Sequence, residues 1–357
     1  MSSLKNSYKY TLQLIADILS YENSIEALEE KMLSNDIDWE QFVYVSSNYL
    51  VLTTCYCRLK EKKLLKYLPE DLLEYLGDIT AINRNRNTTL TEEINQIAKL
   101  LNANNINYVF LKGSALLIKK YYTDLGERML GDIDLLVEEN QMHTCYQLLI
   151  DNGYTGTSQG LTARHFDFKH LPRLQSDSKL AAVEVHKKVL SKPYGGILDP
   201  NKILKQKNHI HNTYVPSNDH LLFHTIMNFQ ANDLGYRYSR ISFKSIYDLL
   251  ILNKMHNYKI SNMLKPAYFE HYFSIGKIFF EDFKDYKSNR FINSMFLMKL
   301  KHPSFRKLID GTLGKIQFIK VMIKSRIWSF ITNRNYRSEL LKEKGINLRF
   351  IGKNIKS

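Results

Sequence analysis

The fold of this chain is decided by residues 109–137, which read VFLKGSALLIKKYYTDLGERMLGDIDLLV. The stretch predicts a strand running into Gly113-Ser114 and then a second strand that carries Asp132 and Asp134. Because residues i and i+2 share one face of a strand, both carboxylates point the same way. Like charges side by side repel each other, and a divalent cation between them removes the repulsion. The apolar run after the acidic pair predicts a buried strand, so the pattern indicates a cation site at the exposed end of that strand.

The order of these motifs resembles the polymerase-beta-like nucleotidyltransferase superfamily. That superfamily carries a hydrophobic residue, Gly, then Gly or Ser, followed downstream by Asp-hydrophobic-Asp on a buried strand. The sequence looks more similar still to an uncharacterised bacterial nucleotidyltransferase family with a longer signature. The resemblance covers residues 100–255. Within it, the stretch from Ser114 to Asp132 is longer than in the shortest members of the superfamily. The signature residues are here Leu111-Lys112-Gly113, Tyr122, Arg128 and Asp132 through Val137.

The resemblance implies an α+β fold, in which a small mixed β-sheet nucleotidyltransferase core is flanked by helical N-terminal and C-terminal regions. Apolar residues at helical spacing support the first of these regions, where Asp38 is a candidate N-cap for a helix from Trp39. We expect a helical N-terminal region (1–102), the catalytic core (103–195), a helical C-terminal region (196–298) and a basic helical extension (299–357).

Two further alternating stretches predict strands in the core. Residues 165–174 alternate, although Pro172 limits that strand to a sheet edge. Residues 180–187 also alternate, with Glu184 and His186 on one face. Helices are predicted over residues 115–122, 142–152 and from Pro200 onward, with the clearest segments at 219–230 and 242–253.

Nucleotidyl transfer, the reaction that the resemblance implies, needs an acceptor oxygen in line with the α-phosphorus and charge neutralisation on the leaving pyrophosphate. Two Mg²⁺ ions about 3.5–4 Å apart can supply both, and three carboxylates on adjacent strands can hold them. Asp132 and Asp134 are two of these. Glu184 is the candidate for the third, as metal ligand and as the group that draws a proton from the attacking hydroxyl, because the superfamily carries an acidic residue on a later strand. The alternative for Glu184 is a solvated strand residue, and Asp167 and Asp177 are weaker competitors.

The glycine-serine pair is the candidate phosphate site. Gly113 permits close backbone approach, amides at a helix N-terminus bind phosphate, and the Ser114 hydroxyl would contact a β- or γ-phosphate oxygen. The family signature implies Lys112 and Arg128 as partners of the triphosphate or of the carboxylates. The alternatives are a plain turn with a serine N-cap and ordinary exposed ion pairs. His186 would either orient substrate or pack as an ordinary histidine.

The remaining histidines and cysteines form no ligand pattern. The pair Cys55-x-Cys57 lacks the two-residue spacing and the second ligand pair of a zinc site. With Cys145, these residues are expected to be ordinary thiols in a reduced compartment. No metal-ligand spacing links His165, His170, His209 and His211.

The composition describes an ordinary globular protein, with 44% hydrophobic and 24% charged residues in a chain of 357. That length is sufficient for two domains and a sizeable core. The beginning of the sequence has no continuous apolar segment, and no stretch reaches the length that spans a bilayer. A cytoplasmic location is therefore expected.

The net charge of +14 is concentrated near the end of the sequence, since residues 299–357 hold 15 Lys or Arg against three acids. Such a basic end predicts contact with phosphates, lipid headgroups or RNA, while the alternative is a Lys-rich background without function. The stretch 315–331 is partly amphipathic and would lie on an anionic membrane, clasp RNA or pack on the domain beneath it. Its apolar side holds Ile316, Ile319, Ile323, Ile327 and Phe330.

Three functions follow from these features. The leading one is a Mg²⁺-dependent nucleotidyltransferase that moves a nucleoside monophosphate, AMP from ATP, to a small molecule or a glycan-pathway metabolite. The second keeps this chemistry but modifies tRNA or another RNA, as toxin-like relatives in the superfamily do, and is motivated by the basic end. The third is a catalytically inactive fold used as a partner- or membrane-binding module, against which the intact carboxylates and Gly-Ser pair argue.

Overall fold

The computed structural model describes residues 8–34, 36–157, 169–191, 194–256 and 266–343. The chain divides into two compact units. Unit 1 comprises residues 1–156 and 169–302, and unit 2 comprises residues 157–168 and 303–357. Among the described helices, none combines the length and hydropathy needed to cross a membrane.

Unit 1 begins with helices, as the sequence predicts. The Asp38 side chain accepts a hydrogen bond from the Gln41 amide at 2.9 Å, which confirms the predicted N-cap of α4. Ser24 caps α3 in the same way through the Ala27 amide. The elements are α2 (Tyr8–Leu19), α3 (Ile25–Leu33), α4 (Trp39–Asn48), α5 (Leu52–Glu61), the 3₁₀ turn η1 (Leu65–Tyr67) and α6 (Glu70–Ala103).

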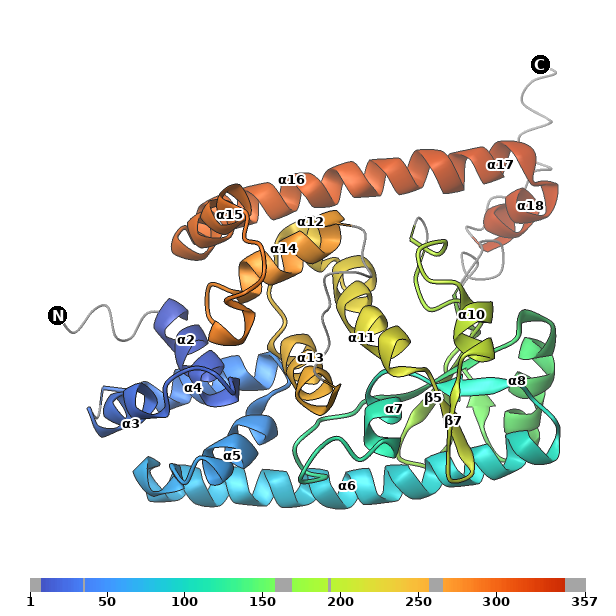
Figure 1. The fold of residues 1–357 in the computed structure, drawn as a ribbon. Helices are drawn as coiled ribbons and strands as arrows, with labels where there is room; N and C mark the ends of the chain where they lie inside the picture. Colours follow the sequence, from blue (N-terminus) through green and yellow to red (C-terminus); the bar gives the residue numbers. More distant parts are fainter. Residues whose placement is uncertain (1–7, 35, 158–168, 192–193, 257–265, 344–357) are drawn as a thin grey trace. The chain divides into compact units, whose positions relative to one another are not determined.

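The long helix α6 connects the N-terminal helices to the sheet (Figure 1). Its 34 residues span about 51 Å at 1.5 Å per residue. Helix α6 buries a row of apolar side chains and, in addition, the polar side chains of Asn83, Asn87 and Glu93. Buried polar groups need hydrogen-bond partners, and these three find theirs in the loops that carry the functional residues.

The central sheet has five strands in the order β1-β2-β5-β4-β3. β2 and β5 run parallel, whereas the other neighbouring pairs run antiparallel. This mixed sheet among helices confirms the predicted α+β class. The strands are β1 (Tyr108–Phe110), β2 (Asp132–Val137), β3 (Thr155–Gly156), β4 (Leu174–Gln175) and β5 (Ala182–His186), with α7 (Lys112–Ile118), η2 (Glu139–Gln141) and α8 (Met142–Asp151) between them.

Three sequence predictions about these elements need correction. Helix α7 begins at Lys112, so the Gly-Ser pair lies in its first turn rather than before it. The strand predicted over residues 165–174 is reduced to β4 and an isolated bridge at His170, since Pro172 offers no amide to a sheet ladder; residues 165–168 lie outside the described residues. The region after Pro200 also contains strands, and not helices alone.

These unforeseen strands form the hairpin of β6 (Asn208–Ile210) and β7 (Thr213–Val215). His211 takes a left-handed conformation, with φ of 53°, at the tight turn between them. The Tyr214 ring packs edge-on against Tyr108 of β1, with ring centroids 5.5 Å apart. Packing against the central sheet therefore favours the hairpin over a helix.

Helices complete unit 1 around an aromatic core. Phe243 contacts both Phe279 and Phe280, and Phe273 stacks on Tyr286 with ring centroids 3.9 Å apart. The elements are α10 (Pro200–Lys205), α11 (Asn218–Met227), the π-helical turn η3 (Asn228–Asn232), α12 (Gly235–Tyr238), α13 (Phe243–His256), α14 (Pro266–Gly276), η5 (Glu281–Phe283) and α15 (Arg290–Lys301).

The described part of unit 2 is almost wholly helical. Arg337 donates hydrogen bonds to the carbonyls of Phe330 and Ile331 at the C-terminal end of α17, where carbonyls lack helical partners. The elements are α16 (Pro303–Val321), the π-helical segment η6 (Met322–Ile327), α17 (Trp328–Thr332) and α18 (Arg334–Glu343).

Candidate active site

The acidic residues of the two parallel strands lie side by side. β2 and β5 pair with Asp134 opposite Glu184 and with Asp132 opposite Ala182. Because side chains alternate along a strand, the three carboxylates lie on one face of the sheet. Asp134 is buried, and the other two are half-buried. The structure thus brings together the three predicted carboxylates, which we call the carboxylate cluster.

Asp134 is the most buried member of the cluster and has a lysine and a histidine as neighbours. Lys112 Nζ lies 2.5 Å from Asp134 Oδ1, and His186 Nε2 lies 2.9 Å from the same oxygen. Burial alone would raise the pKa of Asp134, but Lys112 and His186 together outweigh burial and hold that pKa well below its usual range. The carboxylate is therefore ionised at neutral pH.

Glu184 shares the histidine with Asp134. His186 Nε2 lies 3.3 Å from Glu184 Oε2, and this hydrogen bond is the largest cause that lowers the pKa of Glu184 to about 2. Arg173 Nε approaches Glu184 Oε1 at 3.6 Å, and His170 Nε2 lies 3.9 Å from Oε2. Glu184 is a charged member of a polar network, and the solvated strand residue considered from the sequence is not what the structure shows.

Asp132 lies at the outer end of the cluster and pairs with Arg173 through Oδ2. Partial burial raises the pKa of Asp132 despite the arginine, and the negative charges of Glu184 and Asp134 raise it further. Arg173 therefore bridges the two half-buried carboxylates. It neutralises charge that would otherwise be repulsive.

The turn between β1 and α7 places Lys112 beside the cluster. Lys112 has a positive φ of 52°, a conformation that non-glycine residues rarely adopt. A Cβ on the next residue, Gly113, would lie 2.7 Å from Leu130 Cδ2, so the loop before β2 packs directly on the glycine. Strained backbone of this kind is concentrated at functional sites.

Ser114 presents an unused hydroxyl at this turn. Its Oγ is buried and has no hydrogen-bond partner in the described part of the chain. A buried hydroxyl without a partner costs free energy. The hydrogen-bonding capacity of Ser114 Oγ is therefore unused by the described residues, and the simple N-cap role considered from the sequence is not observed.

Arg128 belongs to a second buried cluster. Its Nε and Nη2 donate to Asp248 Oδ1 and Oδ2 of α13, at 2.8 and 2.9 Å, and Tyr122 donates to the same Oδ1 at 2.8 Å. We call Tyr122, Arg128 and Asp248 the clamp. The structure places Arg128 in this bidentate pair rather than on the carboxylates of β2, so its predicted contact with a triphosphate stays a prediction.

Helix α6 holds the loop that joins α7 to β2. Asn83 donates to the carbonyls of Gly126 and Arg128, at 2.7 and 3.2 Å, and Asn87 donates to the Arg128 carbonyl at 2.7 Å. Glu93 accepts a hydrogen bond from the Leu180 amide at 2.7 Å, just before β5. One helix therefore fixes the approaches to both strands of the carboxylate cluster.

Arg173, Lys169, His224 and Lys244 were not predicted from the sequence. Arg173 had a weak signal, since it follows Pro172 at the expected sheet edge. Lys244 lines a cavity of about 60 Å³ beside Lys112, and burial lowers its pKa. Burial also lowers the pKa of His224, in the same cavity, to about 3, and it lowers the pKa of the half-buried Lys169. The sequence gives these residues no spacing signal, because the fold assembles them from distant elements.

The other candidates lie away from the cluster or outside the described residues. Asp177 is an exposed turn residue. Asp167 and His165 lie outside the described residues. All three cysteines are free, and burial raises the pKa of Cys145 to about 12, so that thiol is protonated and unreactive.

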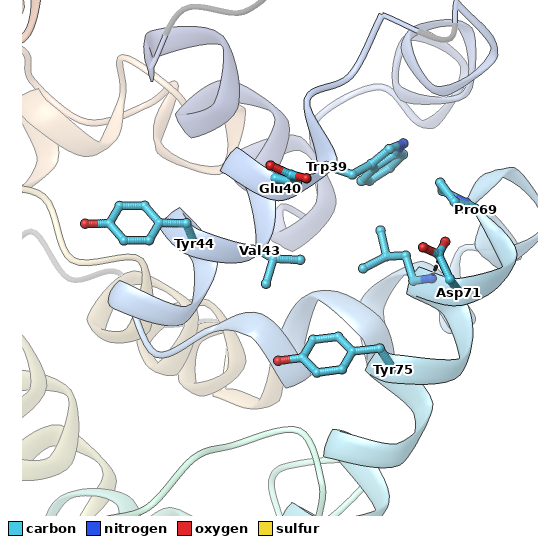
Figure 2. Close-up of a pocket in the computed structure, with 8 residues that line it drawn as sticks. Trp39, Glu40, Val43, Tyr44, Pro69, Asp71 and Tyr75 are labelled. Carbon is cyan, nitrogen blue, oxygen red and sulfur yellow. Dashed lines mark hydrogen bonds between the residues drawn. The ribbon is translucent and has the colours of Figure 1, made fainter.

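A second hollow lies between α4 and the start of α6 and has a volume of about 560 Å³ (Figure 2). Its walls are apolar and aromatic, with Trp39, Tyr44 and Tyr75 among the side chains that line it. The carboxylate cluster contributes nothing to this hollow. Glu40 and Asp71 also line this hollow, whereas the carboxylate cluster and the unpartnered Ser114 hydroxyl lie at the sheet and the turn beside it.

Asp134, Glu184 and His186 each offer a ligand atom within 4.8 Å of the others, a spacing at which they could hold a metal ion. Both contacts to Asp134 use Oδ1, and Arg173 uses only Oδ2 of Asp132. Carboxylate oxygens are therefore left for a cation. Oxygen donors suit Mg²⁺ or Mn²⁺, and an imidazole suits Mn²⁺ better than Mg²⁺. The donor set fits a divalent cation.

Comparisons with known proteins identify the family. The sequence model of a family described as "Uncharacterised nucleotidyltransferase" matches residues 35–259, more than half of the chain. Among solved structures, the chain is similar to an antigenic nucleotidyltransferase-like protein from Paracoccidioides brasiliensis, with 19% identity over 47% of this chain and 77% of that chain, at a TM-score of 0.32. No curated protein matches. The family match confirms the resemblance seen in the signature, and the chain belongs to this family of uncharacterised nucleotidyltransferases.

Proposed function

We propose that this nucleotidyltransferase moves a nucleoside monophosphate, AMP from ATP, to a hydroxyl group of a small molecule or glycan-pathway metabolite. The observation that carries the proposal is the placement of Asp134 opposite Glu184 on parallel strands, with Asp132 on the same face. An unpartnered serine hydroxyl lies in the turn beside them. The reaction needs two parts, the carboxylate cluster to hold metal ions and a turn that can bind the triphosphate.

Asp132, Asp134 and Glu184 would hold two Mg²⁺ ions, with His186 as a further neighbour. When bound, the ions would neutralise the charge that develops on the transferred phosphate and the leaving pyrophosphate. Lys112 and Arg173 reduce the repulsion within the cluster, because each places a positive charge on a carboxylate. Both side chains are partly exposed and long enough to move toward phosphate oxygens.

The remaining steps belong to this chain's own groups. Gly113 lets Leu130 pack against the turn and so fixes its backbone, and Ser114 would donate its hydroxyl to a β- or γ-phosphate oxygen. The acceptor oxygen forms a bond to the α-phosphorus as the bond to pyrophosphate breaks, and the acceptor's proton leaves toward Glu184. With a pKa of about 2, Glu184 is a weak base that orients the hydroxyl and passes the proton on to solvent.

Incubation with each labelled nucleoside triphosphate, Mg²⁺ or Mn²⁺ and a metabolite extract tests the proposal. Wild-type protein should label an acceptor, while Asp134→Asn should lose about a thousandfold or more of the activity, the scale of losing a charge-stabilising group in the transition state. Lys112 is 29% exposed and can turn to solvent in this variant, so the fold should persist.

The matched control is Asp177→Asn, which makes the same chemical change at an exposed turn. It should retain full activity. Equal labelling by wild type and Asp134→Asn would contradict the site. Absence of labelling with every nucleotide and extract would favour a catalytically inactive binding module.

An RNA acceptor is the second candidate, and the charge of residues 299–357 favours it. These residues hold 15 Lys or Arg against three acids. The same assay with purified tRNA in place of the metabolite extract separates the two proposals. Labelled tRNA, with transfer that weakens as salt rises, would support this version.

A further inference from the structure

The helical run of α16, η6 and α17, residues 303–332, exposes an unusual number of large apolar side chains. Such residues are normally buried, and a contiguous exposed set marks an interaction surface. We call this set the apolar stripe. Its members are Leu308, Ile316, Ile319, Ile323, Ile327 and Ile331, which are each between 49% and 67% exposed.

The π-helical segment keeps the stripe on one face of the run. Ile319, Ile323, Ile327 and Ile331 repeat every four residues. In a regular α-helix with 3.6 residues per turn, such a repeat drifts around the axis. The wider turns of η6, over Met322–Ile327, reduce that drift where the repeat passes through it. The local geometry therefore aligns the isoleucines.

Positive charge accompanies the stripe. Residues 303–332 contain six Lys or Arg and one acid, Asp310, so their net charge is 6 − 1 = +5. Trp328 is 64% exposed, and an indole ring is well suited to the boundary between lipid and water. The exposed cations of the run include Arg306, Lys307, Lys315, Lys320 and Arg326.

We propose that this helical run lies flat on an anionic lipid bilayer, with the apolar stripe in the acyl boundary and the cations at the headgroups. A run of 30 residues spans about 45 Å. An apolar stripe of that length with almost no negative charge is complementary to an extended anionic surface. None of the described helices is apolar enough to cross the membrane, so the run would bind at the surface.

Flotation of the full chain with lipid vesicles tests the proposal. Vesicles of phosphatidylcholine and phosphatidylglycerol should bind wild-type protein, whereas vesicles of phosphatidylcholine alone should bind it weakly. Ile323→Glu should lower the affinity roughly tenfold or more, because it removes an isoleucine that the bilayer would bury and adds negative charge. Gln317→Glu adds the same charge outside the stripe and should bind far better than Ile323→Glu.

Substitution of the cations tests the proposal independently. Lys315→Gln and Lys320→Gln should each lower the affinity for anionic vesicles about fivefold, and added salt should diminish this difference. Circular dichroism should show wild-type helix content in every variant, since all the substituted side chains are at least partly exposed.

Two results would overturn the proposal. The first is wild-type protein that stays unbound with anionic vesicles at low salt. The second is a dimer in sedimentation analysis that Ile323→Glu dissociates while vesicle binding is unchanged, which would assign the stripe to a second copy of the chain. Neither result depends on catalytic activity.

Discussion

Two buried ionic clusters of unit 1 contain residues of the same family signature. The clusters differ in how completely their charges are paired. In the clamp, both oxygens of Asp248 receive hydrogen bonds from Arg128 and Tyr122. In the carboxylate cluster, both contacts to Asp134 converge on a single oxygen, Oδ1. The clamp is saturated, whereas the carboxylate cluster still has acceptors to offer.

This difference in pairing indicates different roles for the two clusters. A fully paired buried ion cluster stabilises one arrangement of the chain and resists substitution. An incompletely paired cluster with movable cations can accept a ligand. The signature residues Tyr122 and Arg128 therefore join the sheet region to α13, while Lys112 and Asp134 are the residues that we propose for the chemistry.

Breaking the clamp should produce the largest loss of stability. Arg128→Met leaves the buried Asp248 without its cation, and loss of one partner from a buried pair costs about 3–5 kcal/mol. Urea unfolding measures this change. The double variant Arg128→Met with Asp248→Leu removes both charges and should recover much of the loss.

The same variant also tests the triphosphate role predicted for Arg128. If Arg128→Met keeps wild-type stability but loses nucleotide affinity, the arginine acts on the ligand and the clamp is not structural. A coupling energy near zero between the two substitutions would lead to the same conclusion.

The contacts within the clamp, unlike the carboxylate cluster, could not be predicted from the sequence. The strand period of two placed Asp132 and Asp134 on one face, and the resemblance to the superfamily added Glu184 from a later strand; the structure has the three together. The partner of Arg128 lies 120 residues away in α13, and no local pattern encodes such a pairing. The resemblance to the family covered residues 100–255, and so Asp248, but it did not indicate what Asp248 contacts.

Arg173 and the β6–β7 hairpin were missed for related reasons. Arg173 pairs with Asp132 across the sheet edge, which depends on strand order rather than on spacing. The hairpin strands have three residues each, too few for alternation to be informative. Tertiary contact with Tyr108 decides their conformation.

The carboxylate cluster should respond to acid through Glu184. Its pKa falls from 4.5 to about 2 in the folded protein, so ionised Glu184 stabilises the fold above pH 4.5, and this contribution is lost as pH falls toward 2. Glu184→Gln should therefore be less stable than wild type by about 1–3 kcal/mol at neutral pH, with the gap closing near pH 2.

Urea unfolding in the presence of a chelator measures this gap at both pH values. Glu139→Gln is the control, because Glu139 is 68% exposed and pairs only at the surface with Lys187. It should show little difference from wild type at either pH. A gap for Glu184→Gln that stays constant with pH would refute the assigned electrostatic origin.

The variant with the smallest expected effect on stability distinguishes the roles of the two clusters most clearly. Ser114→Ala removes a buried hydroxyl that has no partner, so the unfolding free energy should change by no more than about 0.5 kcal/mol or rise slightly. The KM for the nucleoside triphosphate should nevertheless rise about tenfold, the scale of one hydrogen bond to a charged group. Ser178→Ala, in an exposed turn, should alter neither quantity. Destabilisation by Ser114→Ala with an unchanged KM would place Ser114 with the clamp, as a structural residue, and would leave the phosphate to the backbone of the turn alone.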